Sequence, residues 1–250
     1  MTPDELLATW HAQQTAFIEF RDLRTRAMLD VIAALSPQAR PHVLDLGCGP
    51  GSLAAAVADR FPQATVVGVD RDPILLRLAE ETNTHGARVR YVDADLTDPS
   101  WVNELGPDRF DAVVSATALH WLDPDQLARL YLSLPPVLNS GAVFLNADHL
   151  YFDGVTHYFL HELSENYRES FRVDQVESGA MTWERWWDEA RAMPGWEQEA
   201  ALWHQRWEHK TTTTKVDLEF HLSLLRAAGF VETSQIFQWF DDRVVFARMP

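Results

Sequence analysis

The sequence predicts an α/β protein with a doubly wound, seven-stranded, mostly parallel sheet, an antiparallel C-terminal hairpin and a helical insertion after strand five. Residues 42–61, HVLDLGCGPGSLAAAVADRF, have the pattern of a short buried strand, a glycine turn and a helix. A second apolar run, TVVGVD, ends on Asp70 roughly 20 residues after the glycines, the spacing of a doubly wound unit. Strand-like runs continue to the end of the chain, and helical patterns separate most of them.

The glycine turn has the composition of a loop that holds a ligand. Gly47, Gly49 and Gly51 permit positive φ and close approach of a ligand, and the helix that follows offers unpaired N–H groups. Their G-x-G-x-G spacing differs from the dinucleotide fingerprint, and the loop lacks the Gly-Lys-Ser/Thr ending of a phosphate-binding loop. With Asp70 placed to meet ribose hydroxyls, a nucleoside is favoured over a polyphosphate. The alternative is a tight turn without a ligand.

Local signals define the remaining elements in order. The sequence TPDE at residues 2–5 forms a capping box with proline at the first helical position, so the first forty residues are predicted to be helical. After the second strand, Asp72 caps a helix that starts with Pro73. RVRYVDADL then alternates as a third strand.

Similar local signals define the second half of the sheet. Residues 110–122, FDAVVSATALHWL, give the fourth strand and its loop, and DPDQ at residues 123–126 is a second capping box. GAVFLNAD is the fifth strand. A last helix ends at Gly229, and the runs FVETSQIFQWF and DDRVVFARMP form two strands joined by a tight turn at Asp241 and Asp242.

Composition limits the classes of function. The 250 residues are 46% hydrophobic and 23% charged, which is ordinary for a soluble globular protein. A net charge of −16 opposes nucleic-acid binding, so a small molecule is the expected partner. The single cysteine, Cys48, is expected to be a packed residue of the glycine turn. The sequence has no export signal and no apolar run of about 18 residues, so we expect no membrane association. A cytoplasmic location is expected instead. A homodimer is compatible with the sequence.

The motif DLGCGPG followed by VVGVD resembles the class I, Rossmann-like S-adenosylmethionine-dependent methyltransferases of small molecules, and later motifs extend the resemblance over residues 43–147 and 216–248. The resemblance implies S-adenosylmethionine as the cofactor. In that family the glycine turn surrounds the methionyl part. The acid before the turn, Asp45 here, orients the sulfonium amino acid, and Asp70 would grip both ribose hydroxyls.

Further contacts follow from the same resemblance. Adenine would lie beside Asp95 and the backbone of Leu96, with Asp93 as the rival acid. An amino-terminal helix often covers the cofactor, which makes Phe17, Phe20 and the nearby arginines candidates to close the site or to meet a carboxylate; core and surface roles are the alternative. The predicted cofactor contacts are Phe20, Arg21, Asp45, Gly47, Cys48, Gly49, Gly51, Asp70, Arg71, Ile74, Asp95, Leu96, Ser115 and His120.

Six of the ten tryptophans lie in a long insertion, which we expect to be a mostly helical lid over an aromatic acceptor pocket. A helical subdomain with its own small aromatic core is the other interpretation, and the two are compatible. The predicted organisation is an N-terminal helical segment at 1–40, a cofactor-binding domain at 41–148 and 216–250, and the lid at 149–215.

Three histidines are candidate catalytic residues. His120 follows the fourth strand, where this family positions the transferring methyl group, and its side chain could accept a proton near neutral pH. Packing of the methionine end is the alternative role. His149 and His157 are further candidates in the insertion. His157 shares a helix face with His161 and Glu165, but no third ligand is fixed by spacing, so no metal site is predicted.

The sequence therefore predicts a methyltransferase that moves the sulfonium methyl group to an oxygen, nitrogen or carbon atom of a small apolar or aromatic metabolite. Two alternatives keep the cofactor and the fold. One is a catalyst of cyclisation or rearrangement, and the other is a non-catalytic protein that binds a partner.

Overall fold

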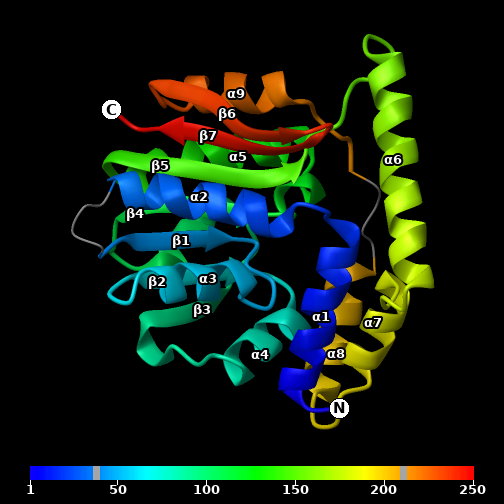
Figure 1. Cartoon of the computed structure of the whole chain (residues 1–250). Coiled ribbons are helices and arrows are strands. Elements are labelled where there is room, and N and C mark those ends of the chain that lie inside the picture. The colour runs from blue at the N-terminus through cyan, green and yellow to red at the C-terminus, as the bar shows by residue number, and fades with distance from the viewer. Residues whose placement is uncertain (36–39, 209–212) are drawn as a thin grey trace.

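The computed structural model describes residues 1–35, 40–208 and 213–250, and its central feature is a seven-stranded sheet (Figure 1). The strand order is β3-β2-β1-β4-β5-β7-β6, with β1 to β5 parallel and β7 antiparallel to both of its neighbours. This confirms the predicted fold class. The strands are β1 His42–Leu46, β2 Thr65–Asp70, β3 Val89–Asp93, β4 Phe110–Ala116, β5 Leu138–His149, β6 Glu232–Trp239 and β7 Asp242–Arg248.

The helices begin where the capping signals indicate. Thr2 and Glu5 form the capping box of the first helix, Asp72 accepts hydrogen bonds from the first turn of α4, and Asp123 forms the capping box of α5. The helices are α1 Pro3–Phe17, α2 Arg21–Leu35, α3 Ser52–Arg60, α4 Pro73–Glu81, α5 Pro124–Ser133, α6 Tyr158–Glu177, α7 Trp183–Arg191, α8 Glu197–Trp207 and α9 Leu218–Ala227. Four short 3₁₀ helices in the described residues are η1 Gly86–Arg88, η2 Pro99–Leu105, η3 Leu119–Trp121 and η4 Pro135–Val137.

The turn of the β6–β7 hairpin lies one residue earlier than predicted. Its two residues are Phe240 and Asp241, because Asp242 already pairs with Trp239 and Phe240 adopts the left-handed φ of 49°. Both acids are buried and paired with arginines. Asp242 forms an ion pair with Arg24 of α2, and Asp241 forms one with Arg168 of α6. The hairpin turn thus connects the N-terminal segment and the insertion to the sheet.

Apolar clusters cover both faces of the sheet. α2 and α3 pack on one face around Val43, and α5 and α9 pack on the other around Phe144. A third cluster combines α1 and α4 with tryptophans of the insertion, including the fully buried Trp186. The insertion tryptophans therefore form a small core with the N-terminal helix, as one of the two interpretations of the sequence expected.

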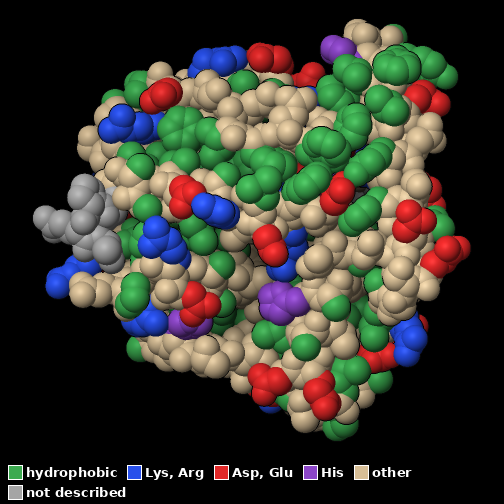
Figure 2. All heavy atoms as spheres, viewed as in Figure 1, with side chains coloured by type: hydrophobic (Ala, Val, Ile, Leu, Met, Phe, Trp, Pro, Cys, Tyr) green, Lys and Arg blue, Asp and Glu red, His purple; other side chains and the backbone are tan. Residues whose placement is uncertain are grey.

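α1 and the insertion helices α6 to α8 gather at the carboxyl ends of the parallel strands (Figure 1). Ser164 is the buried residue of α6, whereas Val155 just before this helix and Tyr158 and Phe159 at its start are exposed. Figure 2 shows hydrophobic side chains on the projecting part of the molecule where Figure 1 places the start of α6. Of the described helices, none combines the length and apolar character needed to cross a bilayer. Residues 36–39 and 209–212 of the predicted segments lie outside the described residues, and the domain boundaries and the homodimer stay predictions.

Candidate functional site

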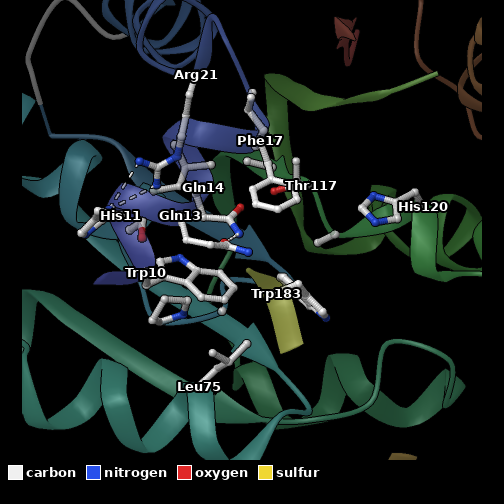
Figure 3. A pocket seen from close by; sticks show the side chains of 18 of the residues that line it. Trp10, His11, Gln13, Gln14, Phe17, Arg21, Leu75, Thr117, His120 and Trp183 are labelled. Atoms are coloured by element: carbon white, nitrogen blue, oxygen red, sulfur yellow. Dashed lines mark hydrogen bonds between the residues drawn. The ribbon is translucent and has the colours of Figure 1, made fainter. Parts of the chain in front are cut away.

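A cavity of about 1250 Å³ lies at the carboxyl edge of the sheet, between the glycine turn and the helices α1, α6, α7 and α8. This is where ligands bind in open α/β sheets. The predicted residues that line it are Arg21, Asp45, Gly47, Cys48, Gly49, Asp70, His120 and His149. The structure therefore brings residues from the N-terminal helices, the insertion and four strand ends to one space, part of which Figure 3 shows from close by.

Close packing explains the glycines of the turn. Gly47 has a φ of +65°, and a Cβ atom added there would lie 2.3 Å from Cβ of Ala118. Gly51 has a φ of +80°, and a Cβ atom there would lie 2.1 Å from the hydroxyl of Tyr91. Both positions require glycine for conformation and for space. Cys48 is buried beside Gly68, which confirms it as a packed residue, and burial together with the nearby acids raises the pKa of its thiol.

We expect Gly47→Ala to lower the melting temperature more than Gly86→Ala. Both glycines have positive φ, so both variants carry a conformational cost of about 1–2 kcal/mol. Only the Cβ atom at position 47 meets Ala118, whereas the space beside Gly86 is open. Overpacking should add about 1–3 kcal/mol to the cost at position 47. Calorimetric unfolding of both variants tests this, and equal melting temperatures would show that the turn moves away from Ala118 freely.

Three carboxyl groups, those of Asp45, Asp70 and Asp72, line the glycine end of the cavity. Burial raises the pKa of Asp45 to about 8, with a further contribution from the charge of Asp70. Burial and the same neighbour raise the pKa of Asp72 to about 7, and burial also raises the pKa of Asp70. So many poorly solvated acids in one wall favour a ligand with positive charge.

The partners of these acids differ. Asp70 accepts hydrogen bonds from the backbone N–H groups of Gly49 at 2.7 Å and of Asp72 at 2.8 Å, and a carboxylate has further lone pairs for a ligand. Asp45 is 1% exposed, and its Oδ2 atom has no hydrogen-bond partner among the described residues. A buried carboxylate oxygen without a partner is costly, so Asp45 is the strongest local indication of a missing donor.

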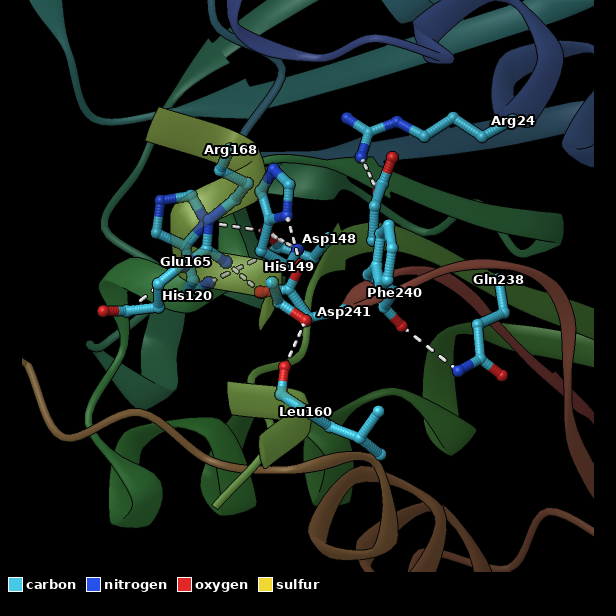
Figure 4. Close-up of polar contacts among 12 residues, drawn as sticks. Arg24, His120, Asp148, His149, Leu160, Glu165, Arg168, Gln238, Phe240 and Asp241 are labelled. Carbon is cyan, nitrogen blue, oxygen red and sulfur yellow. Dashed lines mark hydrogen bonds and ion pairs between the residues drawn. The ribbon is translucent and has the colours of Figure 1, made fainter. Parts of the chain in front are cut away.

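His120, which lines the cavity, and Asp148 form a hydrogen-bonded pair (Figure 4). Nδ1 of His120 lies 2.7 Å from Oδ1 of the fully buried Asp148, whose oxygens also accept the backbone N–H groups of His120 at 3.1 Å and His149 at 2.9 Å. Burial alone would raise the pKa of Asp148, but the charge and hydrogen bond of His120 outweigh it and hold this pKa at about 2. An ionised carboxylate only accepts, so Nδ1 carries the hydrogen and Nε2 is left as the basic atom.

His149 lines the same cavity beside this pair but has a different environment. Its Nδ1 atom is buried, lacks a hydrogen-bond partner among the described residues and lies 3.7 Å from Oδ1 of Asp241. Burial lowers the pKa of its imidazole. The backbone directly after β4 is strained, because Thr117, a β-branched residue at the cavity wall, has a φ of 51°. Such strain is typical of functional sites.

The structure does not bring His157 to the cavity. It is the exposed N-cap residue of α6, and its Nδ1 atom contacts the hydroxyl of Thr156 at 3.0 Å. Helical spacing gave a shared face with His161 and Glu165 but not the direction of that face, so His157 is withdrawn as a catalytic candidate. The described residues contain no group of three or more histidine, cysteine or acidic side chains that could hold a metal ion.

Several predicted cofactor contacts do not line the cavity. Phe20 packs against Trp239 with ring centroids 5.1 Å apart, Ile74 is fully buried in the tryptophan cluster, and the hydroxyl of buried Ser115 donates to the carbonyl of Leu46. Four further predicted contacts also lie outside the cavity lining, namely Gly51, Arg71, Asp95 and Leu96. Tyr91 occupies the space that a side chain at Gly51 would need, and the other three residues follow strands β2 and β3.

The end of α8 covers that side of the sheet. Arg206 makes two hydrogen bonds of 2.7 and 2.9 Å to Asp93, and Arg71 pairs with Asp95 at 2.7 Å. The indole N–H of Trp207 donates to Asp72 at 3.1 Å, and the guanidinium of Arg71 stacks on the same indole. Asp95 is thus held by an arginine, and the predicted adenine position lies beside the end of α8, with Asp95 and Leu96 outside the cavity lining.

Sequence reasoning missed several cavity residues. Gln13 and Gln14 of α1, Asp72, Trp207 and the partner acid Asp148 were not among the predicted site residues, although all except Asp148 line the cavity. The position of Asp148 at the end of strand five, beside the loop after strand four, was a usable signal for its contact with His120.

The comparisons with known proteins agree with this geometry. Residues 43–141 match the family described as a methyltransferase domain. The chain is 36% identical over 124 residues to the trans-aconitate 2-methyltransferase of Azoarcus sp. (strain BH72), covering 50% of this chain and 45% of that protein. It is 30% identical over 166 residues to the enzyme of that name from Rhodopseudomonas palustris (strain BisA53), covering 65% and 60%.

The chain therefore spans about half the length of the curated relatives that it matches. Among solved structures, an O-methyltransferase family protein from Burkholderia thailandensis superposes with a TM-score of 0.58 at 18% identity, covering 90% of this chain and 56% of that one. This likeness supports the fold. The domain match, the glycine turn and the two strand-end acids together make residues 43–141 similar to the methyltransferase domain family.

Proposed function

We propose that this protein transfers the methyl group of S-adenosylmethionine to an oxygen atom of a small molecule bound in the 1250 Å³ cavity. One observation carries the proposal: a single cavity is lined both by Asp45, a buried acid whose Oδ2 atom has no partner among the described residues, and by the His120 imidazole, whose Nδ1 atom is held by Asp148. The first group suits the donor molecule, and the second suits an acceptor that loses a proton.

The residues present fit S-adenosylmethionine. Its ammonium group would supply the hydrogen-bond donor that Oδ2 of Asp45 lacks, and the free lone pairs of Asp70 suit two ribose hydroxyls. The three acids of this wall would also favour the positive sulfonium. The molecule supplies a methyl group on a sulfur atom that leaves as a neutral thioether.

His120 would act on the acceptor. As the acceptor oxygen forms its bond to the methyl carbon, the carbon–sulfur bond breaks and its electron pair stays on sulfur, while the hydroxyl proton passes to Nε2 of His120. Asp148 holds the imidazole in the required tautomer and stabilises the charge that develops on it. Holding both molecules in line can supply about 7–11 kcal/mol at best, so positioning by the cavity walls is as important as the base.

The cavity walls combine aromatic and charged side chains. Phe17, Trp121, Trp183 and Trp203 line it, which fits the predicted flat or apolar acceptor. Two of the relatives are named for methylating trans-aconitate, which is an unsaturated polyacid. Acceptors for the first test are therefore aromatic hydroxy acids and unsaturated polycarboxylic acids.

The test is incubation with S-adenosylmethionine and each acceptor, with detection of S-adenosylhomocysteine and of a product heavier by one CH₂ unit. Formation of both supports methyl transfer. A product of unchanged mass would instead indicate cyclisation or rearrangement. Binding of the donor without any product from the acceptor panel would favour the non-catalytic alternative.

Cofactor affinity should depend on pH through Asp45. Because its pKa in the free protein is about 8, the carboxyl group is protonated at neutral pH, and a cationic ligand requires it to ionise. Affinity for S-adenosylhomocysteine should rise by up to about tenfold per pH unit between pH 6 and 8 and then level off. Titration calorimetry in buffers of different ionisation enthalpy should detect proton release at pH 7. Absence of proton release would contradict the pairing.

A further inference from the structure

Arg21 differs from the other arginines that line the cavity. Arg24, Arg168, Arg172 and Arg191 each form an ion pair with a carboxylate, namely with Asp242, Asp241, Glu169 and Asp188. Among the described residues, Arg21 has no carboxylate within ion-pair distance. Its guanidinium contacts only the Nδ1 atom of His11, at 3.4 Å from each of two nitrogens.

The surroundings of Arg21 do not compensate its charge. Burial lowers the pKa of Arg21, the like charge of Arg24 lowers it further, and the exposed Asp22 opposes this only in part. Burial and the charge of Arg21 also lower the pKa of His11, which keeps that imidazole neutral near pH 7. A partly buried cation beside a second cation is unfavourable unless an anion binds there.

Two glutamines of α1 add hydrogen-bond donors to the same wall. Gln13 is 1% exposed and lines the cavity; its Oε1 atom accepts the amide of Gln14 at 2.7 Å, while its Nε2 atom is buried without a partner among the described residues. Figure 3 shows Arg21, Gln13 and Gln14 on one side of the cavity, and His120 beyond Phe17 and Thr117. The wall therefore offers donors and positive charge, at some distance from the base.

We propose that Arg21 and Gln13 form a carboxylate-binding subsite within the cavity. The planar guanidinium matches a carboxylate through two parallel hydrogen bonds, and the free amide hydrogens of Gln13 provide a third donor. This inference rests on the proposed function, since that function supplies two sources of carboxylate. One is the methionyl carboxylate of the donor, and the other is an acidic acceptor.

The experiment compares wild type, Arg21→Gln and Arg21→Lys by titration calorimetry with four ligands. The ligands are S-adenosylmethionine, its decarboxylated analogue, trans-aconitate and the neutral trimethyl ester of trans-aconitate. Loss of a charge-assisted pair should weaken binding of a carboxylate ligand by about 10–100-fold in Arg21→Gln. The loss in Arg21→Lys should be smaller, because lysine keeps the positive charge but cannot form two parallel hydrogen bonds. The carboxylate-free ligands should bind wild type and variants alike.

The pattern of affinity losses among the four ligands identifies the source of the carboxylate. A loss for S-adenosylmethionine but not for its decarboxylated analogue assigns the subsite to the donor, and a loss for trans-aconitate but not for its ester assigns it to the acceptor. Equal binding of all four ligands by wild type and Arg21→Gln would overturn the proposal, as would failure of wild type to bind either carboxylate ligand. If wild type binds trans-aconitate but not S-adenosylmethionine, the proposed function fails while the subsite stands.

Controls separate binding from folding. Arg26→Gln changes an arginine on the same helix whose side chain is 78% exposed, and it should leave all four affinities unchanged. Gln13→Leu should weaken the same carboxylate ligand as Arg21→Gln, though by less, because one neutral donor is lost. Because Arg21→Gln removes an uncompensated charge, its melting temperature should equal or exceed that of wild type, which excludes unfolding as the cause of weaker binding.

Discussion

Asp45→Asn is expected to weaken binding of S-adenosylmethionine by at least about 30-fold, while it makes the protein more stable at pH 8. The amide removes the buried negative charge that would pair with the ligand ammonium, and the loss of one partner of such a pair costs about 2–5 kcal/mol. Titration calorimetry measures the affinity. Asp30→Asn, which changes an exposed acid, is the control and should bind normally.

The stability gain follows from the direction of the pKa shift. In the folded chain the pKa of Asp45 is about 8 instead of its ordinary 3.8, so the folded state holds a proton that the unfolded state has lost. Folding stability therefore falls as pH rises from about 4 to about 8, by up to about 1.4 kcal/mol per pH unit. Asparagine does not titrate, so the advantage of the variant should grow over this range. Thermal unfolding at pH 5, 6.5 and 8 tests this, and a constant difference would contradict it.

His120→Ala is expected to lower kcat by about 10²–10⁴-fold with a hydroxylic acceptor, while the Kd of S-adenosylmethionine changes little. The imidazole accepts the proton only during methyl transfer, so its loss should appear in kcat. With an acceptor that is already an anion, the loss should be much smaller. A parallel loss of cofactor binding would instead show that His120 packs the methionine end of the site.

Asp148→Asn and His149→Gln test the two neighbours of this base. Asp148→Asn should lower kcat by roughly 10²-fold or more, because an amide no longer selects the tautomer with the hydrogen on Nδ1 of His120. It should also remove stability, about 2 kcal/mol above pH 4, that wild type loses as pH falls towards 2. His149→Gln should retain most of kcat, since its Nδ1 atom faces Asp241. A larger loss in His149→Gln than in His120→Ala would reverse the assignment.

The part of the site on one continuous segment could be predicted from the sequence. Asp45 and Gly47 lie within a strand and its turn, and Asp70 ends the next strand, so strand adjacency alone brings them together. The sheet was predictable for the same reason, because alternating strands and helices leave few topologies. The hairpin turn was misplaced by one residue because an acidic pair resembles a turn, whereas Asp242 belongs to the strand.

The acceptor side depends on contacts that spacing does not encode. His120 was predicted, but its pairing with Asp148 requires the ends of β4 and β5 to lie side by side. Arg206 and Trp207 reach Asp93 and Asp72 across 113 and 135 residues, which no local pattern indicates. His157 failed because helical periodicity identifies a face without its direction.

The two arginine-paired acids of the β6–β7 hairpin, Asp241 and Asp242, have a consequence for biosynthesis. Asp242 is made 218 residues after Arg24, and Asp241 73 residues after Arg168. A nascent chain still attached to the ribosome can complete the first five strands, but Asp242 and Asp241, the partners of Arg24 and Arg168 at the hairpin, are then still absent. We expect the cavity to assemble only when the last hairpin has emerged from the exit tunnel. Premature termination after β5 should therefore leave a chain whose helices stay exposed to chaperones.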